Sequence, residues 1–185
     1  KEHTMKKLFT VLLCGLIAMS LLSGCGSKTN EDTPNTGDDQ TTTDTNTADT
    51  VGGALLNGFN EYVKANPGAT AMDIANNVIT NSVIPAELSL MTMEIEAGYL
   101  NGFDNFEVTG FEQGAIFAPM MGTIPFVGYI FTLPADADVQ AFMDSLTQNA
   151  NLRWNICTSA DEMTVSNVDN PVFFVMAPLS FDTAE

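Results

Sequence analysis

The chain has 185 residues, with 23 acidic against six basic side chains and a formal net charge of −17. So few cations cannot neutralise many phosphates, and binding to nucleic acid through its own side chains is therefore not expected. The length suits one domain of ordinary size, and three cysteines do not make a disulfide framework, so the fold must depend on its hydrophobic core.

The N-terminal segment has the pattern of an export signal. Two lysines after Met5 precede fifteen uncharged, mostly apolar residues, Leu8–Leu22. A positive region followed by an apolar stretch of this length is typical of a secretory signal peptide. We expect residues 1–24 to be that signal, with residues 1–4 upstream of the true start. A membrane-spanning helix is the competing interpretation, at the short edge of what crosses a bilayer.

The end of this segment, Leu22-Ser23-Gly24-Cys25, resembles the lipobox of bacterial lipoproteins: an aliphatic residue, two small residues and a cysteine. The resemblance implies that a diacylglycerol is attached to the sulfur of Cys25 and that a peptidase frees this cysteine as the new N-terminus. It also implies a cell-membrane protein facing the extracytoplasmic side. The two acyl chains of the diacylglycerol would make such an anchor durable. The alternative, cleavage elsewhere beside an unrelated cysteine, lacks the usual A-x-A-like site.

A polar tract follows the cysteine. Residues 26–50 contain nine threonines, six acids and no large apolar residue. Such a composition buries too little surface to offset the entropy of ordering the chain. Residues 25–50 are therefore expected to be the lipidated cysteine and a disordered tether.

The composition changes at Val51, and residues 51–185 are expected to form a single folded domain. Apolar residues recur at helical spacing from Leu55 to Val63 and stop at an Asn-Pro-Gly sequence. A second helix is expected after Thr70, with Asp73 three residues later in a capping-box arrangement.

The rest of the domain has strand patterns around one more helix. A helix is expected from Asp138 onward, because apolar residues recur there on one face. Strands are expected over residues 88–96, 115–120, 124–133, 152–157, 162–168 and 171–177. This order predicts an α+β fold, with an antiparallel sheet of about five or six strands and two to three helices packed on one face.

Three segments of the C-terminal part, LRWNIC from Leu152, ADEM from Ala160 and VFFVMAP from Val172, are similar to uncharacterised small lipoproteins of clostridial-type gut bacteria. The resemblance implies a leader, a threonine-rich spacer and one α+β domain. It supplies no catalytic residue.

Histidine and cysteine chemistry is restricted by position. The only histidine, His3, precedes Met5, so a processed chain would have no histidine for a catalytic triad or a metal site. Arg153 lies four residues before Cys157, about 13 Å away along a strand, too far to activate the thiol. Cys157 is therefore expected to be a buried structural cysteine. By the same strand pattern, Trp154 is expected in the core.

Carboxylates are the remaining catalytic candidates. Glu94 and Glu96 would share a strand face with their Cα atoms about 6.5 to 7 Å apart. That spacing permits an acid/base pair of the glycosidase kind, although the solvent-facing side of an edge or half-exposed strand is the simpler interpretation. Asp104, Glu107 and Glu112 are oxygen ligands suited to calcium, but their spacing matches no recognised calcium loop.

Methionines and aromatic residues are the candidates for contacts. Ten methionines are present, and most are expected to fill the core, because a copper site would need histidine or cysteine as well. Tyr99, Phe103, Phe106 and Phe111 lie in an irregular segment. If at least two of them are exposed, they would form a contact site for a ligand or partner, but a small hydrophobic cluster beneath the loop is the favoured interpretation.

Together these patterns predict a non-catalytic binding or accessory module of the cell envelope, without cofactor or metal. The partners expected are the membrane, through a diacylglycerol on Cys25, and an envelope protein or a glycan. Two alternatives remain: a carboxylate-dependent glycan hydrolase using Glu94 and Glu96, and a calcium-dependent adhesion module using the acidic surface.

Overall fold

A computed structural model describes residues 49–121 and 124–181 of the chain. The expected signal peptide, the lipobox and all but the last two residues of the tether lie outside these ranges. The described elements are α1 (Val51–Ala65), α2 (Ala71–Val78), a 3-10 helix η1 (Ala86–Leu88), β1 (Leu90–Glu94), β2 (Gly98–Tyr99), β3 (Glu107–Val108), β4 (Gln113–Pro119), β5 (Val127–Thr132), α3 (Val139–Asn149), β6 (Glu162–Asn167) and β7 (Pro171–Ala177).

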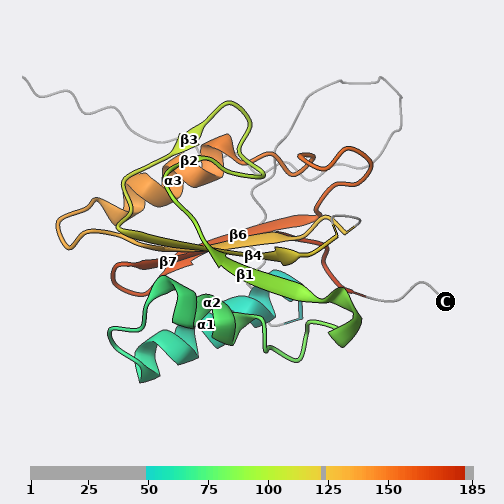
Figure 1. Cartoon of the computed structure of the whole chain (residues 1–185), viewed down its shortest axis with the longest axis horizontal. Coiled ribbons are helices and arrows are strands. Elements are labelled where there is room, and N and C mark those ends of the chain that lie inside the picture. Colours follow the sequence, from blue (N-terminus) through green and yellow to red (C-terminus); the bar gives the residue numbers. More distant parts are fainter. Residues whose placement is uncertain (1–48, 122–123, 182–185) are drawn as a thin grey trace, which may run out of the picture. The chain divides into compact units, whose positions relative to one another are not determined.

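Five strands form one antiparallel sheet in the order β1-β4-β5-β7-β6, and β2 pairs with β3 in a separate ribbon (Figure 1). β5 and β7 are central, and almost all of their residues are buried. β1 and β6 are the two edges. The predicted α+β class and five-stranded antiparallel sheet are therefore confirmed.

Each of the three α-helices begins at a side chain that accepts a backbone hydrogen bond. The Thr50 hydroxyl accepts from the N–H of Gly53 at 3.1 Å at the start of α1. α2 has the expected capping box, since Thr70 and Asp73 each accept a hydrogen bond from the other's backbone N–H. Such caps satisfy N–H groups that the first helical turn leaves unpaired.

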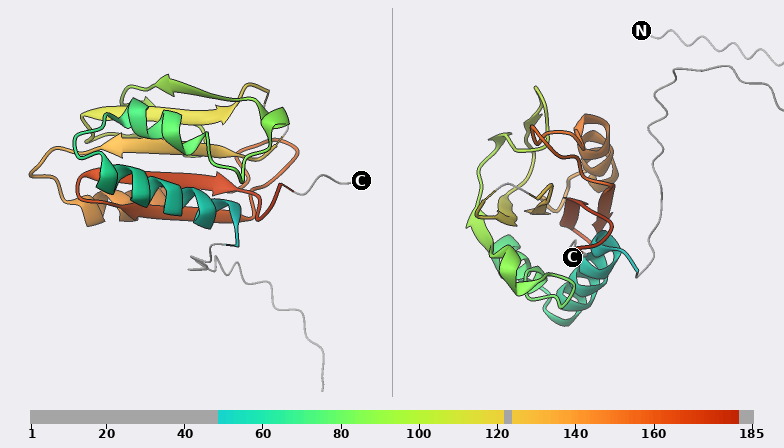
Figure 2. Two further views of the ribbon diagram at one scale, coloured as in Figure 1. Left: turned by 90° about the horizontal axis from the view of Figure 1, so that it is seen from below. Right: turned by 90° about the vertical axis from the view of Figure 1, so that its right-hand side faces the viewer.

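The helices lie on both faces of the sheet. α1 packs against β6 and β7, and α2 packs under β4, β5 and β1 (Figures 1 and 2). α3 covers the opposite face together with residues 95–111. Two helices on one face match the prediction, whereas the third lies on the other face. The reason is that β5 and β7 carry large apolar side chains on both faces, such as Tyr129 and Ile130, and both faces must be covered.

The expected strand at residues 152–157 is absent, and this segment forms turns instead. The side-chain oxygen of Asn151 accepts a hydrogen bond from the N–H of Arg153 at 2.8 Å. Such a local side-chain bond offers the backbone an alternative to a strand. Cys157 is exposed, so the prediction of a buried structural cysteine was wrong. The neighbouring Ile156 is 99% exposed. Trp154 is partly buried against the cluster under α3.

Candidate functional site

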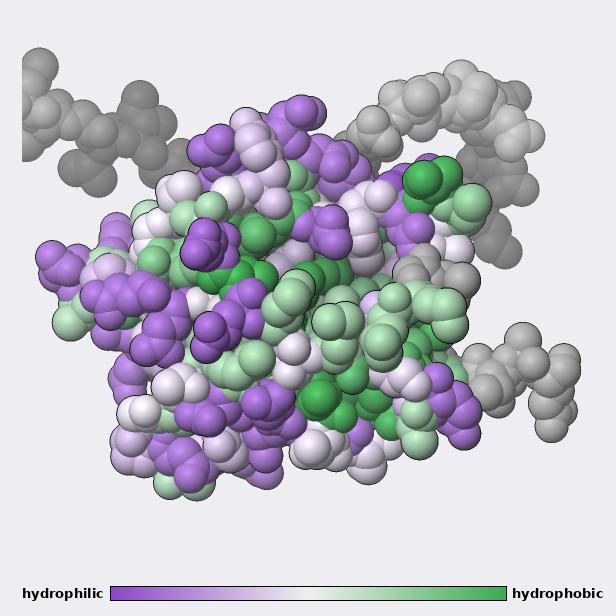
Figure 3. All heavy atoms as spheres, viewed as in Figure 1, coloured by the Kyte–Doolittle hydropathy of each residue, from purple (hydrophilic) through white to green (hydrophobic). Residues whose placement is uncertain are grey.

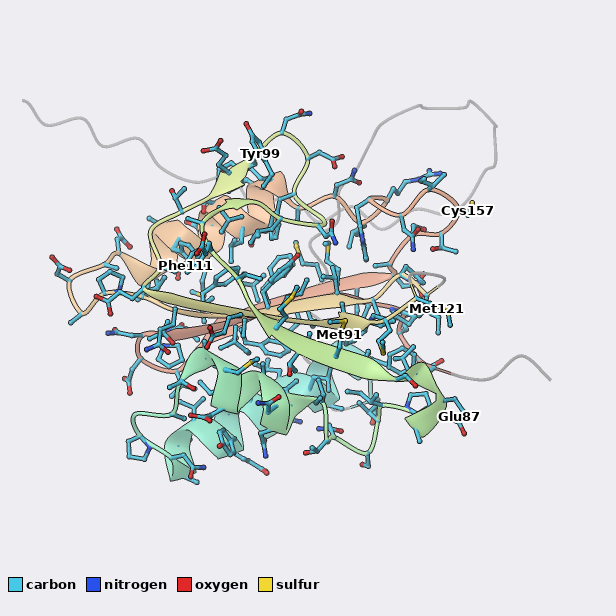
Figure 4. The ribbon with its side chains drawn as sticks, viewed as in Figure 1. Glu87, Met91, Tyr99, Phe111, Met121 and Cys157 are labelled. Carbon is cyan, nitrogen blue, oxygen red and sulfur yellow. The ribbon has the colours of Figure 1, made fainter. Side chains whose placement is uncertain are left out.

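Exposed methionines gather along edge strand β1 and the end of β4. Met91 is 40% exposed, Met93 52%, Met120 71% and Met121 80%. We call these four residues the methionine strip. In Figure 3 pale green side chains lie next to one another over this part of the sheet, and Figure 4 locates Met91 and Met121 within it. Predicting a core role for these four methionines was therefore wrong.

The strip is exposed because the cover on this face stops short of the edge. Met93 pairs with Ile116, which pairs with Tyr129 of β5. Phe103 from the covering segment packs on Tyr129, with 5.9 Å between ring centroids, and Tyr129 is fully buried. One end of this cross-strand row is therefore core, while Met93 at the other end faces solvent.

The backbone of β1 has an unpaired outer side. The N–H of Ile95 donates to the carbonyl of Gly114 at 2.9 Å, so Ile95 faces β4. Because antiparallel pairs alternate along a strand, Leu90, Thr92 and Glu94 direct their N–H and C=O groups away from β4. No strand of the described ranges pairs with that outer side, and β1 is the outermost strand in Figure 2.

This edge lacks the usual protection against strand pairing. Its sequence, Leu-Met-Thr-Met-Glu, has no lysine or proline, whereas natural sheets commonly use these residues or bulges to block edges. Glu87 precedes the strand, Glu94 ends it and Glu96 follows. The described residues include fifteen acids but only two bases, Lys64 and Arg153. The edge is therefore open, apolar on one face and flanked by carboxylates.

Glu94 and Glu96 do not have the setting of a catalytic pair. Both are exposed, Glu94 at the end of the edge strand and Glu96 just beyond it. Neither residue lines either of two surface cavities, of about 290 Å³ beside Val51 and about 500 Å³ beside Lys64. Glycosidic carboxylates must instead flank a bound sugar, so this geometry does not favour the hydrolase alternative.

The four aromatic residues singled out in the sequence have different positions. Phe103 is only 3% exposed, and Phe106 and Phe111 are partly buried in the cluster under α3. Tyr99 is 71% exposed and points away from the sheet in Figure 4, whereas Phe111 lies close to it. The segment therefore forms the expected small cluster beneath the loop. Phe103 is too buried for the partner contact considered in the sequence analysis, and of the four residues only Tyr99 is largely exposed.

The acids proposed for calcium are not gathered. Within residues 49–121 and 124–181, no three histidine, cysteine, aspartate or glutamate side chains lie together in a way that could hold a metal ion. The Asp104 carboxylate accepts instead from the side-chain amide of Asn151. Glu107 lies in β3 and Glu112 precedes β4.

Two buried ionisable side chains serve the fold. The Glu162 carboxylate on β6 accepts from the N–H of Gly52 at 2.7 Å, at the positive N-terminal end of α1. The Tyr129 hydroxyl donates to the carbonyl of Asn101 at 2.9 Å, and burial raises the pKa of Tyr129 above its ordinary value. Each group has a partner within the protein, so each hydrogen bond ties two segments of the fold together.

No family model matches the chain, and no curated protein or solved structure is significantly similar to it. In the part of the chain that the structure describes, no helix is both long and apolar enough to span a bilayer. The methionine strip and the open edge of β1 are consequently the features that bear most directly on function. The sequence showed the alternation of Met91 and Met93 with polar residues, but it left open whether their strand lies at an edge or is only half exposed.

Proposed function

We propose that this protein is a membrane-anchored extracytoplasmic lipoprotein whose α+β domain is a non-catalytic binding module of the cell envelope. The observation that carries the binding role is the methionine strip, because large apolar side chains gathered outside a core mark interaction surfaces. The anchoring role rests on the resemblance of Leu22–Cys25 to a lipobox.

Methionine suits such a surface for a physical reason. Its side chain is unbranched, flexible and polarisable, so it adapts to partners of different shape. The neighbouring backbone groups of β1 add hydrogen-bonding positions that a protein strand matches better than a sugar does. We therefore favour an envelope protein over a glycan as the partner.

The anchor is tested by replacing the sulfur that would carry the lipid. Cys25→Ser should shift the protein from the membrane and detergent phase to the aqueous phase in a detergent-partition assay. Cys157→Ser is the matched control, since it removes an exposed thiol of the folded domain. The anchor proposal fails if the Cys25 variant partitions like the unchanged protein.

The binding role is tested by photo-crosslinking in cells. A photoreactive residue at position 93 or 120 should give discrete crosslinked products, and the same residue at position 156 should not. Ile156 is the control because it is apolar and 99% exposed but lies outside the methionine strip. Identical products at all three positions would contradict a specific binding surface.

A further inference from the structure

We propose that β1 accepts an added antiparallel strand from a partner protein, and that this strand alternates apolar residues with polar ones, including a lysine or arginine opposite Glu94. The inference rests on the proposed binding function and specifies the chemistry of its partner. Adding a strand to an exposed sheet edge is a general mode of peptide recognition, in which backbone bonds provide affinity and alternate side chains provide specificity.

The backbone of β1 fixes the pairing. Leu90, Thr92 and Glu94 offer three N–H and three C=O groups on the outer side, as the alternation from the Ile95–Gly114 bond requires. An antiparallel strand would form its hydrogen-bonded pairs at these three positions. Its intervening residues would then stand opposite Met91 and Met93.

The methionines require apolar partners. Non-hydrogen-bonded antiparallel pairs bring Cα atoms to about 4.5 Å, the closest approach of side chains across strands. Residues opposite Met91 and Met93 would therefore pack directly on the methionine side chains. An apolar residue opposite Met93 would extend the hydrophobic row that runs from Tyr129 through Ile116. An apolar residue opposite Met91 would extend the neighbouring row from Ala118.

The other face of β1 requires polar and basic partners. The Thr92 hydroxyl donates to the side-chain oxygen of Asn76 at 2.6 Å, so this face is polar at the centre of the strand. Glu94 lies on the same face by the alternation of side chains. A lysine or arginine opposite Glu94 would form a cross-strand pair of opposite charge, which favours pairing.

Charge also decides between a foreign strand and a second copy of this chain. Fifteen acids against two bases give the described residues a strongly negative field. A second β1 would bring the same carboxylates, including Glu87, Glu94 and Glu96, and two negative domains would repel each other. A basic segment is attracted by that field, so charge complementarity favours it.

The test uses a synthetic peptide written as the antiparallel complement of residues 90–96, acetyl-Lys-Val-Lys-Val-Thr-Val-Thr-amide. Fluorescence anisotropy would measure its binding to the full-length chain in detergent micelles. The control peptide has the same sequence but is N-methylated at the three residues opposite Leu90, Thr92 and Glu94. It keeps the charge and loses the backbone donors, so we expect at least tenfold weaker binding.

Protein variants locate the site. Met91→Ser combined with Met93→Ser should weaken peptide binding at least tenfold, whereas Ile156→Ser should change it less than twofold. Both sites are exposed, and near-ultraviolet circular dichroism would verify that the fold is kept. Glu94→Gln should lower the affinity for the peptide and make that affinity less dependent on salt. The salt range to measure is about 0.1 M to about 1 M, over which the Debye length falls from about 10 Å to about 3 Å.

Amide hydrogen exchange gives a residue-level readout. In the free protein the amides of Leu90, Thr92 and Glu94 should exchange rapidly, and peptide should slow them at least tenfold. If the N-methylated peptide binds as tightly as the unmodified peptide, backbone pairing does not contribute to binding and general charge attraction explains it. That result would overturn the proposal. Slowing that appears on raising the protein concentration alone would show pairing with a second copy and would also overturn it.

Failure of this proposal can be separated from failure of the proposed function. If the peptide does not bind but crosslinks at position 93 remain specific, strand addition is wrong and the binding module stands. If the specific crosslinks are lost as well, the binding role itself is wrong.

Discussion

Gly128 on β5 provides the sharpest test of how the core is packed. It pairs with Phe117 of β4 and Val175 of β7, on the face covered by α1 and α2. The Phe117 ring occupies the space where another residue would carry its Cβ. Gly128→Ala should therefore force an aromatic ring out of a packed position, although alanine is a small residue.

The size of the effect follows from the contact distances. A Cβ built on Gly128 would overlap three carbons of the Phe117 ring, and even the farthest of them, Cε1, lies only 2.7 Å away. Carbons in good contact are about 3.5 to 4.0 Å apart, and Cζ and Cε2 of the ring lie even closer than Cε1, so the ring would have to move by more than about 1 Å. Phe117 is fully buried, with ring centroids of Phe126 and Phe173 at 5.9 and 6.3 Å. Overpacking costs about 1 to 3 kcal/mol, and replacing a strand glycine offsets about 0.5 to 1 kcal/mol of it, which leaves a net loss of about 0 to 2.5 kcal/mol.

A double-mutant cycle isolates this contact. Urea unfolding, followed by the fluorescence of Trp154 and by circular dichroism, would give the free energy of unfolding for Gly128→Ala, Phe117→Leu and the combination. Leucine leaves room for the new Cβ, so Gly128→Ala should be neutral or slightly stabilising in the Phe117→Leu background. The coupling energy should then be about 1 to 3 kcal/mol.

Additive effects of the two substitutions would refute a clash between Cβ and the Phe117 ring. If Gly128→Ala costs as much in the Phe117→Leu background as beside the native phenylalanine, the ring is not what excludes a side chain at this position. A coupling that appears together with a changed urea dependence would instead indicate a change in the denatured state.

Three further predictions concern local features. Gly52→Ala should lower the free energy of unfolding by about 1 to 3 kcal/mol, because its Cβ would lie 3.0 Å from the carboxyl carbon of Glu162; an unchanged urea midpoint would contradict this. The Thr70 hydroxyl donates to Asp73 and holds the pKa of Asp73 below its ordinary value of 3.8. The ionised Asp73 carboxylate therefore contributes to stability above that pH, and this contribution is lost as the pH falls through the lowered pKa. Asp73→Asn should flatten the decline of Tm with pH below about pH 4. An unaltered slope of Tm against pH would count against this role of Asp73. Cys157 should react with a maleimide in the native protein, as mass spectrometry of its peptide would show, whereas labelling only in denaturant would contradict its exposure.

Local patterns predicted the helices well. The capping box at Thr70 and Asp73 joins residues three positions apart, so the sequence contains the whole interaction. The helix after Asp138 was predicted from another local pattern, apolar residues that recur on one face, and Asp138 accepts from the N–H of Ala141 at 3.0 Å at its start. Local competition also explains the failed strand, because the turn at Asn151 overrode the strand pattern of residues 152–157.

Burial was harder to predict than secondary structure. Met91 and Met93 alternate with polar residues as expected, yet both are substantially exposed. Phe103, by contrast, lies in an irregular segment and is buried against Tyr129. Alternation shows which side chains share a face, and it does not show what covers that face.

The sequence by itself determined the α+β class, the three helices, the acidic charge and the lipobox resemblance at Cys25, which remains a prediction outside the described residues. Each depends on composition or on neighbours within a few positions. The tertiary structure alone decided the position of α3, the edge position of β1 and the exposure of the methionine strip. All three depend on the order of strands in the sheet. β1 pairs with β4, which is distant in the sequence, and with no other strand of the described sheet. The local pattern of a single segment does not contain such long-range pairing.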